Sequence, residues 1–138
     1  MPGTDGAGVV VAVGSRVRRF RRGDRVYAYS FDNSKGGFYA EYAAVPAQKT
    51  GRVPRRLDLF HAGGGATTAL TALHGVDDAL KIRKGEAIII HGASGGVGTL
   101  AVQFAKRRGA RIFATASGKD GVALTRRLGA EAAWMGTR

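Results

Sequence analysis

A glycine-rich turn between an apolar run and a helical segment constrains the fold of this chain more than any other feature. Residues 86–91 (EAIIIH) form a continuous apolar run, which is typical of strands buried on both faces of a parallel sheet. The turn at residues 92–98 follows directly, and residues 97–108 carry apolar side chains at the spacing of an amphipathic helix. A strand, a tight turn and a helix in this order predict the start of a parallel α/β unit.

The same alternation continues after the first helix. Residues 111–116 (RIFATA) predict a second strand, residues 119–128 predict a second helix that ends at Gly129, and residues 132–135 predict the beginning of a third strand. Residues 86–135 therefore predict the order β-α-β-α-β, which is the mononucleotide-binding half of a doubly wound fold.

The turn fits the dinucleotide fingerprint A-x-G-x-x-G, with Ala93 in its first position. A small first residue permits the tight turn, Gly95 lets a pyrophosphate approach the backbone, and Gly98 lets the helix pack closely against the strand. The N–H groups at the start of the helix then face the phosphates. The alternative is a purely structural glycine turn. We predict that the cofactor-binding residues here are Ala93, Ser94, Gly95, Gly96, Val97 and Gly98.

The end of the second predicted strand indicates which dinucleotide binds. NAD enzymes usually place Asp or Glu about 20 residues after the fingerprint, where it holds the ribose 2′-hydroxyl. This chain has Ser117 and Lys119 there, with no carboxylate before Asp120. A hydroxyl and a cation suit a 2′-phosphate, so the sequence favours NADP(H). The alternative is that Ser117 and Lys119 only cap the following helix.

The first part of the chain predicts a different architecture. Short β-rich segments at residues 8–14, 25–29 and 41–45 are separated by turn residues, which is typical of a piece of a barrel or sandwich. Residues 62–80 then have helical composition in their second half, although three successive glycines weaken its start. We expect one domain over residues 1–60 and a second over residues 61–138.

Positive charge is in large excess, with 22 Lys and Arg against 10 Asp and Glu, a net charge of +12. Such a charge can bind polyanions without a sequence code. The bases are scattered among apolar segments, as on solvated faces, and only Phe20 interleaves with the arginines of residues 16–25 as a base-stacking platform would. Nucleic-acid binding therefore stays open but is not favoured.

Several classes of protein are excluded. The chain has no Cys, which removes disulfide scaffolds, thiolate nucleophiles and Cys-ligated zinc. No apolar run approaches the roughly 20 residues of a membrane helix, and the N-terminus lacks the basic region of a secretory signal. We expect a cytoplasmic protein with no membrane partner and no metal. We expect His91 to be packed and hydrogen-bonded, not a metal ligand.

With these motifs in view, the chain resembles the medium-chain dehydrogenase/reductase superfamily, closest to its zinc-independent quinone oxidoreductase branch. The resemblance runs almost from end to end and follows the family's order. The matching stretches are P-G-x-[DE]-x-x-G at residues 2–8, F-x-x-G-D-R-V at residues 20–26, A-E-Y-x-x-V-P at residues 40–46, L-T-A at residues 70–72, and G-G-V-G…A-V-Q-x-A-K at residues 95–106.

The resemblance implies an α/β chain made of an incomplete GroES-like β-barrel piece and the first βαβαβ half of a Rossmann fold. It places Thr71 near the nicotinamide. It puts Thr4 and Thr67 where zinc-dependent relatives carry His and Cys ligands, which implies no zinc site. It implies hydride transfer from NADPH to a small-molecule quinone or activated enone, mostly by positioning, and a possible homodimer.

Members of that family are more than twice as long as this chain. We therefore expect the chain to be a fragment of the full enzyme. Two other interpretations stay open: a catalytically inert NADP-binding fragment and a basic nucleic-acid-binding protein.

Overall fold

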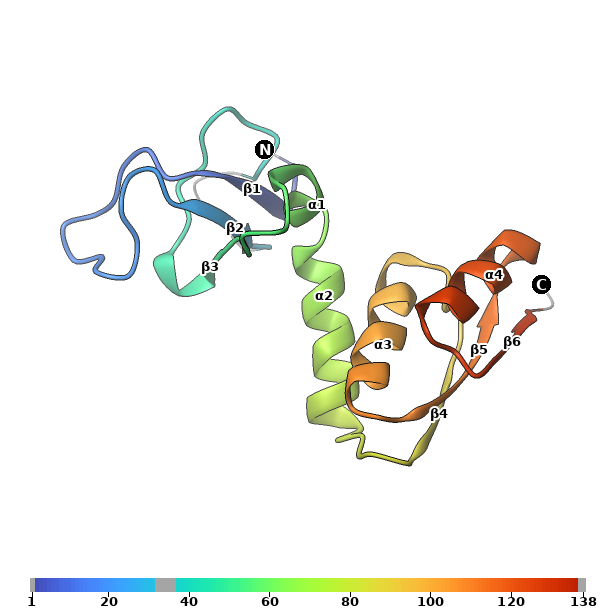
Figure 1. Cartoon of the computed structure of the whole chain (residues 1–138). Coiled ribbons are helices and arrows are strands. Elements are labelled where there is room, and N and C mark those ends of the chain that lie inside the picture. Colours follow the sequence, from blue (N-terminus) through green and yellow to red (C-terminus); the bar gives the residue numbers. More distant parts are fainter. Residues whose placement is uncertain (1, 32–36, 137–138) are drawn as a thin grey trace. The chain divides into compact units, whose positions relative to one another are not determined.

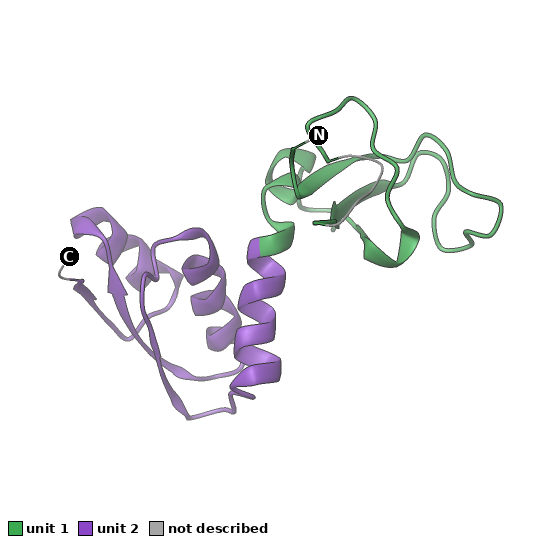
Figure 2. Cartoon of the chain, turned by 180° about the vertical axis from the view of Figure 1, so that it is seen from behind, with its two compact units in different colours: residues 1–67 green, residues 68–138 purple. Residues whose placement is uncertain are grey.

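The computed structural model describes residues 2–31 and 37–136, and it divides the chain into two compact units. Unit 1 comprises residues 1–67 and unit 2 comprises residues 68–138 (Figure 2). The division falls inside helix α2 (Ala66–Leu73), so the two units share one helix.

Unit 1 contains an antiparallel sheet of three strands, in the order β1 (Asp5–Val9), β2 (Arg25–Tyr29) and β3 (Thr50–Arg52) (Figure 1). A single helical turn, η1 (Ala47–Lys49), precedes β3. Helix α1 (Leu59–Gly63) packs against β1 and β2. Among the described residues of this unit, the sheet is the layer that α1 covers.

Two of the predicted strands in unit 1 are placed differently in the structure. The strand expected over residues 8–14 covers Asp5–Val9, and its pairing ends where the Val10 N–H donates to the Asp24 carbonyl (2.9 Å). Residues 41–45 form no strand; the third strand is Thr50–Arg52. A strand needs a paired neighbour to satisfy its backbone. The strand pairs of this sheet lie within Asp5–Val9, Arg25–Tyr29 and Thr50–Arg52.

Unit 2 has the predicted β-α-β-α-β order. Its strands β4 (Ala87–Ile90), β5 (Arg111–Ala116) and β6 (Ala132–Met135) are parallel and neighbour one another in sequence order. Helix α3 (Gly96–Arg107) connects the first two and α4 (Gly118–Leu128) connects the last two (Figure 1). The prediction of a β-barrel piece followed by a parallel βαβαβ segment is confirmed.

The core of unit 2 lies between this sheet and its helices. Ile112 and Val102, each at most 1% exposed, form one buried cluster with Val76, Ile88 and Ala133. These residues come from three strands and two helical segments, so the cluster joins every layer of the unit.

One face of the parallel sheet is less covered than expected. The run EAIIIH predicted a strand buried on both faces, but only Ile88 and Ile90 are buried, and Ile89 is 65% exposed. Trp134, which is 55% exposed, stacks on Phe113 on β5 with ring centroids 6.4 Å apart. Both connections of a right-handed βαβαβ unit place their helices on the same face, which leaves the opposite face bare.

The predicted helix over residues 62–80 consists of three pieces. Gly64 and Gly65 separate α1 from α2, and a turn of π-helix, η2 (His74–Ala79), follows α2. In that turn the Leu80 N–H donates to the Gly75 carbonyl (3.1 Å). Val76 on η2 is 2% exposed and joins the core, so this turn packs on α3. None of the described helices is both long enough and apolar enough to cross a membrane.

Candidate cofactor site

The glycine-rich turn joins the end of β4 to the start of α3. Gly92 has φ +63°, a left-handed conformation that favours glycine. Ala93 is fully buried and its N–H donates to the Thr115 carbonyl (2.8 Å), while the Gly95 N–H donates to the Gly92 carbonyl (2.9 Å). The turn is therefore fixed by its own backbone and by the neighbouring strand β5.

Gly98 has no room for a side chain. A Cβ atom there would lie 2.4 Å from the Gly92 carbonyl oxygen and 2.6 Å from the Ala93 Cα. Both are backbone atoms, which cannot move aside as a flexible side chain can. The close packing of α3 on the turn therefore requires glycine at this position.

Gly95 and Gly96 lie at the exposed start of α3. Gly95 is the N-cap residue of this helix, and no side chain caps it. A Cβ on Gly95 would meet only the Gly92 oxygen, at 3.3 Å, so its outer side is open. The first N–H groups of a helix have no partner within the helix, and the helix dipole makes this end positive. An open glycine surface over such N–H groups fits a pyrophosphate.

Helix α2 comes close to the same turn. A Cβ on Gly96 would lie 3.2 Å from the Cγ2 methyl of Thr68. Thr71 is three residues further along α2 and is exposed. Residues three apart share one face of a helix, so Thr71 lies on the face of α2 that carries Thr68. The structure brings this face, and not only β4 and α3, to the glycine turn.

The segment predicted to read the 2′-phosphate begins directly after β5. Ser117 and Lys119 are both exposed, and so is Asp120, which lies in the first turn of α4. Ser117 is the N-cap residue of α4, but its side chain makes no capping hydrogen bond. If Ser117 served only as a helix cap, its side chain would be expected to make this hydrogen bond, and it does not.

Sequence reasoning missed one contact between these two segments. The Ser117 backbone N–H donates to the Oγ of Ser94, with the two atoms 3.2 Å apart. A glycine inside a predicted helix, Gly121, was the available signal. A Cβ on Gly121 would lie 2.9 Å from that same Oγ, so Ser94 fills the space that Gly121 leaves.

His91, which ends the run before the turn, differs in part from its expected environment. It is exposed, not packed, because it lies on the bare face of the sheet. Its Nδ1 shares a hydrogen bond with the Thr115 Oγ1 (3.2 Å), as expected of a hydrogen-bonded histidine.

The two positions compared with zinc ligands are occupied by threonines, and one of them has a distinct role. The Thr67 N–H donates to the Asp5 carboxylate (3.1 Å), and the Thr67 hydroxyl donates to the same oxygen. This contact ties β1 to the first turn of α2. Within residues 2–31 and 37–136, no group of three or more His, Asp or Glu side chains gathers as a metal site would require.

The arginine-rich segment of unit 1 makes contacts within the chain. Phe20 is only 7% exposed, and the guanidinium groups of Arg19 and Arg52 lie over its ring, 4.9 and 5.6 Å from the ring centroid. Arg52 also pairs with Asp24 (3.1 Å). The one aromatic residue of this basic segment is therefore covered and does not offer a stacking surface to a base.

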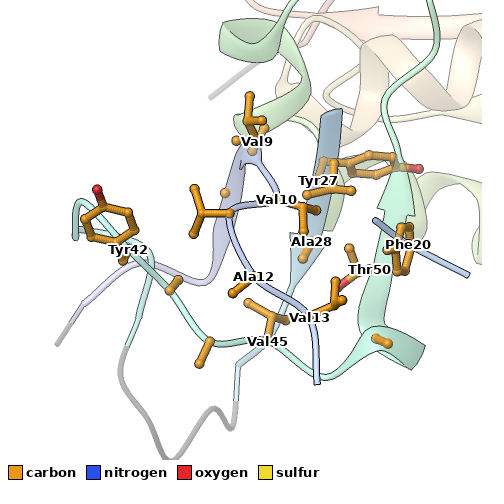
Figure 3. A pocket seen from close by; sticks show the side chains of 18 of the residues that line it. Val9, Val10, Ala12, Val13, Phe20, Tyr27, Ala28, Tyr42, Val45 and Thr50 are labelled. Carbon is orange, nitrogen blue, oxygen red and sulfur yellow. The ribbon is translucent and has the colours of Figure 1, made fainter. Parts of the chain in front are cut away.

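A groove of about 420 Å³ opens in unit 1. Residues 9–13 and 40–45 supply nearly half of its lining residues, nearly all of them apolar, and Figure 3 shows Val10, Val13, Tyr42 and Val45 around it. Residues 11–14 and 41–45, which form no strand, are among the residues that line it. It offers apolar contact but few polar groups that would fix the orientation of a ligand.

Shifted pKa values occur at surface ion pairs of unit 2, away from the glycine turn. A hydrogen bond from Arg108 holds the pKa of Asp77 below its ordinary value, and a hydrogen bond from Arg111 does the same for the pKa of Glu131. Arg108 links the end of α3 to η2, and Arg111 links β5 to the segment before β6. These pairs tie neighbouring elements together.

Comparison with known proteins assigns the family. Residues 1–55 match the family model of the alcohol dehydrogenase GroES-like domain. The quinone oxidoreductase of Homo sapiens is 36% identical over 129 residues, which are 94% of this chain and 38% of that protein. The chain belongs to the medium-chain dehydrogenase/reductase superfamily. It is quinone oxidoreductase-like, and its antiparallel sheet is the GroES-like part.

Solved structures of superfamily members agree with this assignment. An alcohol dehydrogenase superfamily protein from Novosphingobium aromaticivorans is 37% identical, with a TM-score of 0.88 over 100% of this chain and 42% of that one. The quinone oxidoreductase of Escherichia coli, solved with NADPH, is 30% identical, with a TM-score of 0.83 over 95% of this chain and 39% of that one. The chain spans about two fifths of the length of these relatives.

Proposed function

We propose that this chain is the cofactor-holding part of an NADPH-dependent reductase that transfers a hydride to a quinone or an activated enone. The observation that carries the proposal is the glycine turn, where Gly98 permits close packing and Gly95 leaves the start of α3 open. The Escherichia coli relative was solved with NADPH, which supports this cofactor. The full reaction belongs to a protein of the length of the relatives.

Each element has a distinct role in this proposal. The backbone N–H groups of the turn would bind the pyrophosphate, and Ser117 and Lys119 would hold the 2′-phosphate. Thr71 would contact the nicotinamide from α2, which also reaches the turn through Thr68. NADPH, when bound, supplies the hydride. The proposed cofactor residues are Thr71, Ala93, Ser94, Gly95, Gly96, Val97, Gly98, Ser117 and Lys119.

No side chain of this chain is given the role of acid, base or nucleophile. The residues of the turn are glycines and small residues, which bind and orient but do not exchange protons. Catalysis would then come from holding two reactants in a productive geometry and excluding water. The proposal that the hydride acceptor is a quinone or an activated enone rests on the family to which the chain belongs.

A second candidate function is NADP binding without turnover. It needs only the glycine turn and the segment of Ser117 and Lys119, which both lie within this chain. Nucleic-acid binding is a weaker candidate, because arginine side chains cover Phe20, the ring on which a base would stack.

The role of Lys119 is tested by removing its charge. We expect Lys119→Ala to weaken NADPH binding about tenfold, because a charge-assisted hydrogen bond contributes about 1.5–3 kcal/mol and each 1.4 kcal/mol is tenfold. NADH binding should stay unchanged, since NADH has no 2′-phosphate. The matched control is Arg127→Ala, which removes one positive charge from the other end of α4. Equal losses in both variants would show that Lys119 acts only through the net charge.

Turnover separates the first two candidate functions. The purified 138-residue chain is mixed with NADPH and a simple quinone, and oxidation of NADPH is followed by absorbance. Chain-dependent oxidation that Lys119→Ala slows at low NADPH supports the reductase. NADPH binding without oxidation supports the inert binding module. A nucleic-acid affinity that falls steeply with salt, with no NADPH binding, would contradict both.

A further inference from the structure

We infer that Ser94 is a positioning residue for recognition of the 2′-phosphate, and not only a member of the pyrophosphate turn. Its hydroxyl oxygen accepts the hydrogen bond from the Ser117 N–H (3.2 Å). That N–H belongs to the N-cap residue of α4, in the segment that carries Lys119. This inference rests on the proposed function, because it explains how that segment is held.

The geometry around Ser94 supports a fixed contact. Ser94 is half-buried and lies in the turn after β4, whereas Ser117 follows β5, the next strand of the sheet. Gly121 in α4 leaves room for the Ser94 side chain, since a Cβ there would lie 2.9 Å from its Oγ and 3.0 Å from its Cβ. Ser94 therefore reaches from the turn into the space beside the first turn of α4.

The local backbone conformation explains what this contact holds in place. Gly118, directly after Ser117, has φ +66°, so the chain bends sharply between β5 and α4. The Ser117 side chain makes no capping hydrogen bond, so the bend is not held by the usual N-cap contact. The Ser94 hydroxyl holds it instead, from the neighbouring turn. The two segments proposed to contact the pyrophosphate and the 2′-phosphate are thus joined by one side chain.

The consequence is a coupling between two parts of one cofactor site. Removing the hydroxyl should leave the pyrophosphate turn intact, because the backbone bonds of Ala93 and Gly95 hold that turn. It should loosen the segment of Ser117 and Lys119. The preference for a 2′-phosphate should therefore fall while general adenine nucleotide binding persists.

The test compares NADP+, which carries the 2′-phosphate, with NAD+, which is identical except that it lacks this phosphate. Binding of both to the full chain is measured by calorimetry, and the ratio of their affinities is the readout. We expect Ser94→Ala to lower this ratio about fivefold, the effect of one ordinary hydrogen bond. Gly121→Ala should lower it as well, because the added methyl group displaces the Ser94 hydroxyl. In the Lys119→Ala background, Ser94→Ala should cause little further loss.

The matched control is Thr99→Ala. It also removes a hydroxyl from the start of α3, but that hydroxyl donates to the Gly96 carbonyl (3.0 Å) and not to the α4 segment. The affinity ratio should be unchanged in this variant. A readout independent of the ligand is hydrogen exchange at the Ser117 N–H, which should be faster in Ser94→Ala and unaltered in Thr99→Ala.

The outcomes separate this inference from the proposed function. A wild-type chain that binds neither nucleotide, or both equally, overturns the proposed function and this inference with it. A wild-type preference that persists in Ser94→Ala overturns this inference alone. An equal loss of both affinities in Ser94→Ala also overturns it, because the hydroxyl then serves the pyrophosphate turn.

Discussion

The two units of this chain differ in how they bury apolar side chains. In unit 2 a continuous cluster of buried residues joins three strands to the helices between them. In unit 1 the buried apolar residues are few, and Val11 (56%) and Tyr42 (74%) remain well exposed. A parallel βαβ unit contains its own covering helices within its sequence, whereas in the described part of unit 1 the short helix α1 is the one that packs on the antiparallel sheet.

This difference separates the parts of the molecule whose structure can be predicted from the local sequence from the parts whose structure cannot. Consecutive strands pair in both units, but in unit 2 each parallel pair is joined by a helix that the local apolar pattern also predicts. In unit 1 residues 41–45 form no strand, and the third strand is Thr50–Arg52 instead. We therefore expect substitutions in unit 2 to affect stability more than equivalent substitutions in unit 1.

The largest effect is expected from Gly98→Ala in unit 2. The added methyl group would collide with backbone atoms of Gly92 and Ala93, at 2.4 and 2.6 Å. We expect the free energy of unfolding to fall by about 3 kcal/mol, at the upper end of typical overpacking costs. Urea denaturation measures it.

Gly95→Ala is the contrasting variant in the same turn. Gly95 has φ −79°, which an alanine adopts without strain, and the nearest atom would be 3.3 Å away. It should cost much less stability than Gly98→Ala and weaken NADPH binding. If both alanine variants were equally stable, Gly98 would not be a packing glycine.

A smaller effect is expected from shortening one core side chain. Ile112→Val removes a methylene from a residue that is 1% exposed, which should cost about 1 kcal/mol of stability. Val11→Ala in unit 1 removes more atoms from an exposed side chain, yet its effect should stay within about 0.5 kcal/mol. Thermal denaturation of both variants compares the units directly. A larger loss for Val11→Ala would reverse the contrast.

The smallest effect is expected from the Arg111–Glu131 pair in unit 2. Arg111 lowers the pKa of Glu131 from its ordinary value of 4.5. The pair therefore adds stability above pH 4.5, and this contribution is lost as the pH falls through the lowered pKa. Both side chains are about half exposed, so solvent screens the pair and its effect is small.

Glu131→Gln tests this contribution by a pH series of melting temperatures. The variant should melt slightly below the wild type at neutral pH and approach it in acid, and added salt should reduce the difference. Asp58→Asn is the counterpart in unit 1. There the pKa of Asp58 is lowered chiefly by a hydrogen bond from the backbone N–H of His61, and an amide oxygen can also accept this hydrogen bond. A difference at Glu131 that persists in acid would contradict the ion-pair explanation.

Much of unit 2 was predictable from the sequence because its signals are local. The strand at residues 111–116 was predicted with its observed bounds, Arg111–Ala116. Exposure of Ile89 was not predicted, because an apolar run does not reveal whether a second layer covers it. The strand expected at residues 41–45 was wrong for a similar reason, since pairing depends on a distant segment.

The candidate site divides in the same way. The glycine turn was located from its spacing, and the need for glycine at position 98 follows from backbone contacts beside it. The bond from Ser117 to Ser94 joins residues 23 positions apart, and no local pattern predicts it. The assignment of Ser117, Lys119 and Thr71 to the cofactor stays a prediction.

The central claim is that unit 2 contains a dinucleotide site that prefers NADPH. The most direct measurement is the melting transition of the purified 138-residue chain alone, with NADPH and with NADH at equal concentration. A ligand at 100 times its dissociation constant should add about 2.7 kcal/mol of stability. The account predicts a clear upward shift with NADPH and a small one with NADH. Equal shifts with both cofactors, or no shift with NADPH, would contradict it.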